Sequence, residues 1–219
     1  MKVLLALRFD GDRDAFRKSV SSELSELVDR GGAQRAALDV QVTGEEHEIL
    51  EALDTEPGIT AVVSLWEPES RDAALGLPLP PGAELVGAYE VTEVVQREYE
   101  RTWPADAVSP GVKIVCFVNR RPDLSHDAYS AHWRERHGPL ALAHQPGFWH
   151  YVQNHVVERL TDTTPVFDGI GELHFRSAEE VHTGMFDSDE GMALIWEDTE
   201  RFMDHTKSTT QPTNEYLVP

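Results

Sequence analysis

The chain has 219 residues, of which 40% are hydrophobic and 26% charged, a composition typical of a folded, soluble protein. Asp and Glu outnumber Lys and Arg by 39 to 19, and the resulting net charge of -20 repels nucleic-acid phosphates and anionic membrane surfaces. No apolar run approaches the ~20 residues of a membrane-spanning helix, and the single cysteine, Cys116, cannot form an intrachain disulfide, so we expect a cytoplasmic protein that binds neither nucleic acid nor membranes.

The first hundred residues alternate between strand and helix patterns. Short apolar runs predict strands, while Phe16, Val20 and Leu24 recur at helical spacing until Gly31 and Gly32 end the pattern. The order β-α-β-β-α-β is that of a ferredoxin-like fold. The expected strands are Lys2–Arg8, Ala36–Thr43, Ile59–Trp66 and Leu85–Gln96, and the expected helices are Asp12–Arg30 and Glu69–Leu75, with a shorter candidate at His47–Leu53.

A linker is expected over residues 101–111, where Pro104, Pro110 and Gly111 interrupt the pattern, and the same order of elements then repeats. Ser125 is well placed to cap the first helix of this second half. The expected strands are Val112–Val118, Phe148–Val157, Ile170–Phe175 and Asn214–Val218, and the expected helices are Ser125–Leu142, Ala178–Phe186 and Glu197–Asp204.

The two halves align weakly with each other. Two ferredoxin-like sheets, each covered by helices on one face, can bury their bare faces against one another and close into a barrel. We therefore predict an α+β protein in which repeats at 1–100 and 112–219 form a dimeric α/β-barrel within one chain, a pseudo-dimer. The matched segments are Asp14–Phe16 with Asp127–Tyr129, Ile59 with Ile170, and Val91–Val94 with Thr213–Tyr216.

The second half resembles an EthD-type domain of the dimeric α/β-barrel superfamily, over about half of the chain, Val112 to Val218. Members of such families usually build the barrel from two identical chains, so a fused pair with one altered copy is a departure. The stretches that carry the resemblance are Asp123–Leu140 with its His132-Trp133-Arg134-Glu135-Arg136-His137-Gly138-Pro139 core, Tyr151–His155, Phe167–Phe175, Glu197-Asp198, Arg201-Phe202 and Glu215.

This resemblance implies a small, mostly apolar substrate held between the sheet and the helices. The activities it implies include cofactor-free aromatic monooxygenation, lactone isomerisation, polyketide cyclisation or dehydration, and haem-dependent chemistry. A fold does not by itself define a reaction, so the candidate residues decide the prediction.

His137 is the strongest candidate for catalysis. On a helix it lies four residues after Trp133 and eight after Tyr129, so the three side chains share one face. We expect Gly138-Pro139 to end the helix, which places His137 in a last turn where the helix dipole favours the protonated imidazole. A half-buried imidazole beside two aromatic rings suits proton abstraction from an activated carbon, although a core histidine bonded to a carbonyl is the structural alternative.

Polar residues on the predicted strands complete the expected site. Alternation places His150 and Asn154 on one face and Tyr151 on the other, and it gives Glu172 and His174 a common face. We expect Glu172 to act in catalysis with His137, and the other residues to hold or orient the substrate together with Tyr129 and Trp133. The alternative is that Glu172 and His174 point into a wet barrel interface and bond across it.

The first copy is expected to lack a site, because apolar residues occupy the aligned positions. Leu24 stands in place of His137 and Val20 in place of Trp133, and the chosen strand alignment gives Ala61 for Glu172 and Val63 for His174. The inference of one site, in the second repeat, depends on these alignments.

No metal or nucleotide motif is present, so we predict no cofactor, with haem as the alternative because a single histidine can ligate it. The sequence favours an enzyme that uses acid/base chemistry on a small aromatic or polyketide-like compound. A haem-binding protein and a non-catalytic small-molecule binding or accessory protein remain the alternatives. Fusion removes the need for a partner chain, so a monomer or a homodimer is compatible with the prediction.

Overall fold

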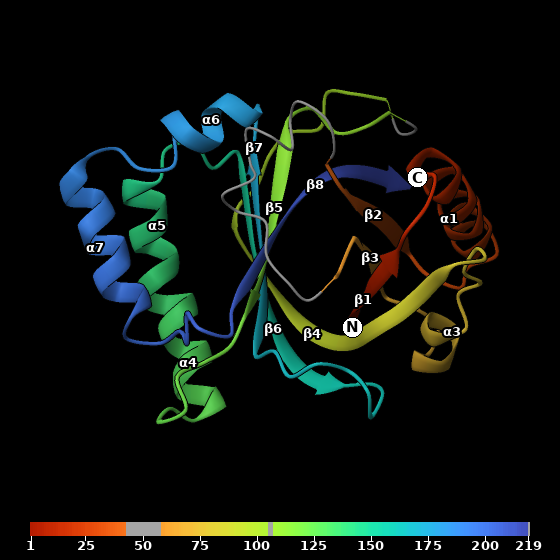
Figure 1. Ribbon diagram of the computed structural model, residues 1–219, viewed down its shortest axis with the longest axis horizontal. Coiled ribbons are helices and arrows are strands. Elements are labelled where there is room, and N and C mark those ends of the chain that lie inside the picture. The colour runs from red at the N-terminus through yellow and green to blue at the C-terminus, as the bar shows by residue number, and fades with distance from the viewer. Residues whose placement is uncertain (43–57, 105–106, 219) are drawn as a thin grey trace.

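Eight strands close into a single barrel in the order β1-β3-β2-β8-β5-β7-β6-β4. This computed structural model describes residues 1–42, 58–104 and 107–218. The barrel consists of two four-stranded antiparallel sheets of the same order, β4-β1-β3-β2 and β8-β5-β7-β6, which are joined by the β2–β8 and β4–β6 pairings. The helices lie outside the barrel, α1 and α3 on one side and α4 to α7 on the other (Figure 1). The predicted pseudo-dimer of ferredoxin-like repeats is therefore confirmed.

The first repeat contains the predicted elements with small changes at their ends. Asp12 caps α1 by accepting a hydrogen bond from the Ala15 amide, and Ser70 caps α3 in the same way through Ala73. The predicted helix at His47–Leu53 lies outside the described residues. The bounds are β1 Lys2–Phe9, α1 Arg13–Asp29, β2 Arg35–Gln41, β3 Ala61–Trp66, α3 Arg71–Leu75 and β4 Ala83–Arg97.

The second repeat departs from prediction in its last third. The helix expected over Glu197–Asp204 is wrong: the helix spans Asp189–Thr199 and begins after Ser188, which accepts a hydrogen bond from the Gly191 amide. The last strand begins at Thr209 rather than Asn214, because polar residues and Pro212 hide its strand pattern. The bounds are β5 Val112–Val118, α4 His126–His132, the π-helical turn η2 Trp133–His137, α5 Gly138–His144, β6 His150–Arg159, β7 Gly169–Phe175, α6 Ala178–Thr183, α7 Asp189–Thr199 and β8 Thr209–Val218.

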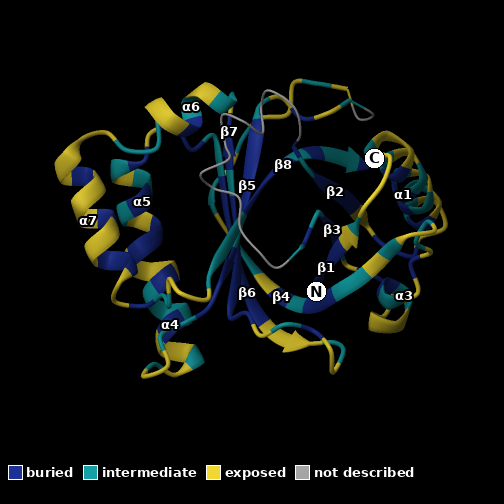
Figure 2. Ribbon diagram, in the orientation of Figure 1, coloured by how far each residue is buried: buried dark blue, intermediate teal, exposed yellow. Residues whose placement is uncertain are grey.

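Most strands are buried on both faces, apart from parts of β4 and the exposed end of β6 (Figure 2). The outer faces pack against the helices, where α1 contributes Phe16, Val20 and Leu24. The barrel interior is apolar in one part, where Leu4 and Phe117 belong to one hydrophobic cluster. Charged and polar side chains fill the rest of the interior, so the barrel has a polar centre that the outer layers lack.

The strand registers define which residues of the two repeats are equivalent. Lys2 pairs with Trp66 and Val91, and Lys113 pairs with His174 and Thr213, so the two lysines occupy matching positions. This confirms the alignment of Val91–Val94 with Thr213–Tyr216. The alignment of Ala61 and Val63 with Glu172 and His174 is wrong. The registers instead match Ser64 with Glu172 and Trp66 with His174, because the connections before the two strands differ in length.

Candidate active site

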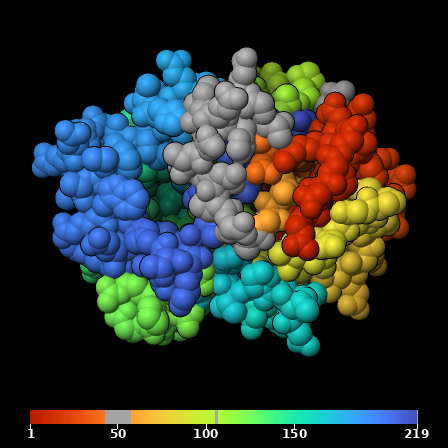
Figure 3. Space-filling view, viewed as in Figure 1, coloured from red at the N-terminus to blue at the C-terminus, as the bar shows by residue number. Residues whose placement is uncertain are grey.

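A cavity of about 390 Å³ lies between the second repeat's sheet and its helices. Most of its walls are apolar or aromatic, and its polar lining residues are His137, His205, Tyr151 and a few residues with hydroxyl or amide groups. The surface is hollowed between the blue-coloured segments that include α6 and α7 (Figure 3). The lining residues include Cys116, Trp133, His137, Gln145, Phe148, Tyr151, Leu173, Met185, Phe186, Ile195, Trp196, Thr199, Met203, His205 and Thr210.

His137 and His132 share one carboxylate on α7. His137 Nδ1 lies 3.0 Å from Asp198 Oδ2, and His132 Nε2 lies 2.9 Å from Asp198 Oδ1. Because a carboxylate accepts hydrogen bonds, both of these ring nitrogens carry protons. With Nδ1 donating to Asp198, the ring nitrogen that can accept a proton is Nε2, which is turned away from Asp198. This is the arrangement of a general base oriented by a carboxylate.

Asp198 remains ionised in this position. Burial opposes its charge, but the hydrogen bonds from His137 and His132 outweigh that effect and hold the pKa of this carboxyl below its ordinary value. The ring of Phe202 packs against both imidazoles, with centroid distances of 5.1 Å to His137 and 5.0 Å to His132. Carboxylate and phenyl ring together fix the orientation of the His137 ring.

A π-helical turn places His137 at the cavity, and the prediction that Gly138-Pro139 ends the helix is wrong. The helix continues to His144, because the Gly138 amide bonds to the Trp133 carbonyl five residues earlier and the turn widens around Pro139, which has no N–H. His137 therefore does not lie in a last helical turn, and the charged group beside it is Asp198.

Two glutamines of the barrel strands satisfy the carbonyls of the widened turn. Gln153 Nε2 donates to the Trp133 carbonyl at 2.9 Å, and Gln96 Nε2 donates to the Arg134 carbonyl at 3.1 Å. Gly138 allows this close approach, since a Cβ at this position would lie 2.5 Å from the Gln96 side chain. The turn that carries His137 is therefore bonded directly to β4 and β6.

Tyr151 offers a hydroxyl group in the same cavity. Its oxygen accepts a hydrogen bond of 2.8 Å from Gln153 Nε2, and burial raises the pKa of the phenol, so the hydroxyl keeps its proton and can donate it to a bound oxygen atom. Cys116, which also lines the cavity, is a poor nucleophile, because burial raises the pKa of its thiol to about 12.

The structure divides the eight predicted site residues between the two faces of the sheet. His137, Trp133 and Tyr151 line the helix-side cavity, and Tyr129 is fully buried behind it, with its ring 5.7 Å from that of Trp133. The other four, Glu172, His174, His150 and Asn154, face the barrel interior. Strand alternation explains the division: Gly171 and Leu173 of β7 line the helix-side cavity, while Glu172 between them points the other way.

Glu172 therefore does not lie beside His137, and the predicted pairing of these two residues in catalysis is corrected. Its carboxylate bonds to Lys2 at 2.9 Å and to Lys113 at 3.0 Å, and it accepts a hydrogen bond from Asn154 at 2.8 Å. His174 Nε2 donates to the Pro110 carbonyl at 2.9 Å. The alternative reading of Glu172, as a residue that bonds across the barrel, is the one that the contacts support.

Two residues that organise the helix-side cavity, Asp198 and Gln153, are not among the predicted site residues. Asp198 belongs to one of the motifs that carry the family resemblance, but the predicted helix over Glu197–Asp204 begins too late to reveal its contact with His137. Gln153 shares a strand face with Tyr151, and this alternation was the available signal. Its role as a donor to the π-helical turn depends on an irregularity that periodicity does not reveal.

The fold defines a dimeric α/β-barrel protein, here closed within one chain. Residues 121–206 match the family model of the EthD domain. No curated protein matches its sequence. Among solved structures, it is similar to an anthrone oxidase-like protein, with 12% identity, a TM-score of 0.56, and 99% of this chain and 93% of that chain covered. It is also similar to a variant of chlorite dismutase from Candidatus Nitrospira defluvii, with 14% identity, a TM-score of 0.50, and 100% and 90% of the chains covered.

No group of three or more His, Cys, Asp or Glu side chains within 1–42, 58–104 and 107–218 is placed to hold a metal ion. No helix in the same part of the chain is long and apolar enough to cross a membrane.

Proposed function

We propose that this protein is an enzyme that removes a proton from a small aromatic or polyketide-like compound, with His137 as the general base. The observation that carries the proposal is the His137–Asp198 hydrogen bond at the wall of a mostly apolar cavity of about 390 Å³. An apolar cavity with a few convergent polar groups is typical of small-molecule sites. A compound with one or two aromatic rings suits this volume and these walls.

The proposed chemistry follows from the positions of three polar side chains. His137 Nε2 takes a proton from an activated C–H group, and the ionised Asp198 stabilises the imidazolium that forms. The negative charge moves onto the oxygen of the adjacent carbonyl or phenol, and the Tyr151 hydroxyl donates a hydrogen bond to that oxygen. Trp133 and Phe148 confine the ring system of the substrate.

Several reactions can begin with this proton removal, namely cyclisation, dehydration, isomerisation and reaction of the carbanion with oxygen. The lining favours none of them over the others. We therefore propose proton abstraction from an aromatic or polyketide-like compound as the function. The structure of the substrate determines which reaction follows.

Haem is the alternative occupant of this cavity. Among the described residues, the lining offers a ligand for the iron but no partners for the propionates. His137 Nε2 offers a nitrogen ligand, and a carboxylate on the opposite ring nitrogen is common among metal-bound histidines. The described lining contains no Lys or Arg to neutralise the two propionates of haem. This donor set does not fit haem, and the proposed chemistry uses protein side chains alone.

Native mass spectrometry of freshly purified protein, followed by an absorption spectrum after haem addition, tests the proposal. We expect a co-purifying aromatic compound and turnover of related compounds without added cofactor. A Soret band that is lost in the His137→Ala variant would favour the haem alternative. Slow release of an unconverted compound by both the wild type and that variant would favour a carrier.

A further inference from the structure

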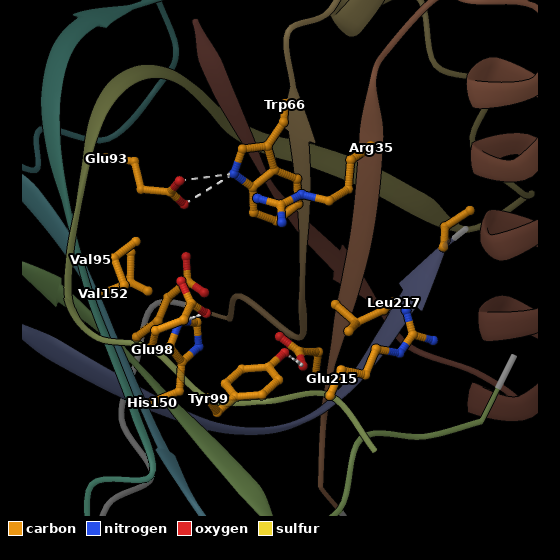
Figure 4. A pocket seen from close by; sticks show the side chains of 13 residues that line it. Arg35, Trp66, Glu93, Val95, Glu98, Tyr99, His150, Val152, Glu215 and Leu217 are labelled. Atoms are coloured by element: carbon orange, nitrogen blue, oxygen red, sulfur yellow. Dashed lines mark hydrogen bonds and ion pairs between the residues drawn. The ribbon is translucent and has the colours of Figure 1, made fainter. Parts of the chain in front are cut away.

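A second cavity, of about 210 Å³, lies inside the barrel on the other face of the sheet. We name it the barrel chamber. Both repeats build it: Trp66 and Glu93 come from the first, and His150, Glu172 and Glu215 from the second (Figure 4). The proposed function does not use any of these residues.

Glu93, Glu172 and Glu215 of the chamber wall belong to a buried network that has more negative than positive side chains. Lys2 and Lys113 are nearly fully buried there. Lys113 pairs with Asp39 at 3.0 Å, with Glu172 at 3.0 Å and also with Glu215, and Lys2 pairs with Glu172 at 2.9 Å and Glu93 at 2.7 Å. These contacts join two lysines to four carboxylates, Asp39, Glu93, Glu172 and Glu215. Full ionisation therefore leaves two negative charges without a cation.

The titration of Asp39 reflects this imbalance. Burial raises the pKa of its carboxyl to about 7, Lys113 opposes the shift, and Glu215 and Glu172 add to it. The pKa of Glu215 is instead lowered to about 2, because Lys113 and other donors outweigh the effect of its burial. Near neutral pH a fraction of the Asp39 carboxyl groups is therefore protonated, which reduces the excess negative charge of the network.

Among the described residues near the chamber, the buried polar atoms without a partner include a donor, Trp103 Nε1, as well as acceptors on His174 and Asn154. His174 is 1% exposed and its Nε2 donates to the Pro110 carbonyl, so Nδ1 carries a lone pair, which receives no hydrogen bond from the described residues. Asn154 is fully buried, its amide group donates to Ile170 and Glu172, and its carbonyl oxygen receives no hydrogen bond from them either. These two acceptors are therefore open to a donor from a ligand.

Two arginines, Arg35 and Arg101, line the rim of the barrel chamber and would attract an anionic ligand. Arg35 stacks on the Trp66 ring at 3.9 Å, and Arg101 donates to the Trp103 carbonyl at 3.2 Å. Both side chains are exposed, so water can solvate them. An anion that entered farther would meet Glu172 and Glu215, in a protein whose net charge is -20. The balance of charge favours a cation.

We infer that the barrel chamber binds a small protonated amine, whose ammonium group lies beside Glu93, Glu172 and Glu215. Val95, Val152 and Leu217 provide apolar contacts for its carbon chain. At roughly 30 Å³ for each non-hydrogen atom, the chamber has room for about seven such atoms. An ammonium group supplies the positive charge that the network lacks, together with up to three donors.

Titration calorimetry with n-butylammonium chloride at pH 7 tests this inference. We expect saturable binding by the wild type and at least 10-fold weaker binding by Glu93→Gln. Glu98→Gln, which removes a carboxylate from the exposed rim, should weaken binding by a smaller factor and has little reason to affect folding. His137→Ala, on the other face of the sheet, should bind as the wild type does, which separates this inference from the proposed function.

Binding should also release a proton near pH 7, because the added positive charge favours ionised Asp39 among Lys113, Glu172 and Glu215. Calorimetry in two buffers of different ionisation enthalpy measures this release, and Asp39→Asn should abolish it. Equal binding of n-butanol, preferential binding of butyrate, or no saturable binding of the ammonium ion would each overturn the inference. Unchanged affinity in both Glu93→Gln and Glu98→Gln would do the same.

Discussion

His137 illustrates how a single residue acquires a candidate role from its neighbours. The sequence placed it on a helix face with Trp133, and the structure puts both residues on the wall of the helix-side cavity. Asp198, which orients the imidazole, lies 61 positions later in the chain. Helical periodicity relates only residues a few positions apart, so it could not reveal this partner.

Replacing His137 with Ala should lower turnover by about 100-fold to 10,000-fold, the contribution typical of a general base. The melting temperature should change little, because Asp198 keeps its hydrogen bond to His132. Steady-state kinetics and thermal denaturation of the same preparation check both statements. A folded variant with full activity would remove His137 from the mechanism.

Asp198→Asn should lower kcat by about 10-fold to 100-fold, as expected for a group that acts through another residue. An amide can donate to His137 Nδ1, which would leave the proton on Nε2 and remove the base. The pH profile of kcat should change together with its size. His132→Gln serves as the control, because its amide can still donate to Asp198, and this variant should keep most of the activity.

The π-helical turn η2 shows why an element can be predicted correctly in type and incorrectly in detail. Ser125 and the apolar spacing predicted the start of this helix, and the Ser125 side chain caps it by accepting a hydrogen bond from the Ala128 amide. Gly138-Pro139 resembles a helix end, yet the Gly138 amide bonds to the Trp133 carbonyl, and side chains of neighbouring strands donate to the Trp133 and Arg134 carbonyls. A local sequence pattern does not contain information on partners so far away in the chain. The start of β8 was mispredicted for the same reason, because β8 is held by pairing with β2 on one side and β5 on the other.

Gln153→Leu should destabilise the protein by about 1–3 kcal/mol, since the fully buried Gln153 side chain donates to both the Trp133 carbonyl and the Tyr151 hydroxyl. We also expect lower kcat, because the turn that carries His137 loses its bond to β6. Chemical denaturation measures the first effect and kinetics the second. Gln96→Met, which removes a partly exposed donor from the same turn, should cost less stability; an equal or larger loss would argue against this ranking.

At the scale of the whole molecule, the charged network in the barrel links the two repeats. Lys2 of the first repeat bonds to Glu172 of the second, and Lys113 of the second bonds to Asp39 of the first. The fold class and the repeat were predictable from the order of elements. The charged interior was not, because its members stand on six different strands and each looks like an isolated polar residue in its own segment.

The pH dependence of stability should reveal Asp39. Its pKa is about 7 in the folded protein against an ordinary value of 3.8, so the folded state holds a proton that the unfolded state releases, and stability falls as pH rises between these values. Asp39→Asn should therefore raise the melting temperature more at pH 8 than at pH 5. Melting curves of both proteins at the two pH values measure this difference. A parallel pH dependence would show that Asp39 is ionised throughout.

The matched registers of the two repeats carry a consequence for how such a centre can arise. Lys2 and Glu93 in one half correspond to Lys113 and Glu215 in the other, but Ser64 corresponds to Glu172, and Asp39 to Asn154. Two identical chains would have to present the same residue at both members of each couple. Joining the copies in one polypeptide removes that restriction, so Lys113 can pair with three carboxylates while Lys2 pairs with two. A barrel assembled from separate, equal subunits could not reproduce this lopsided arrangement of charge.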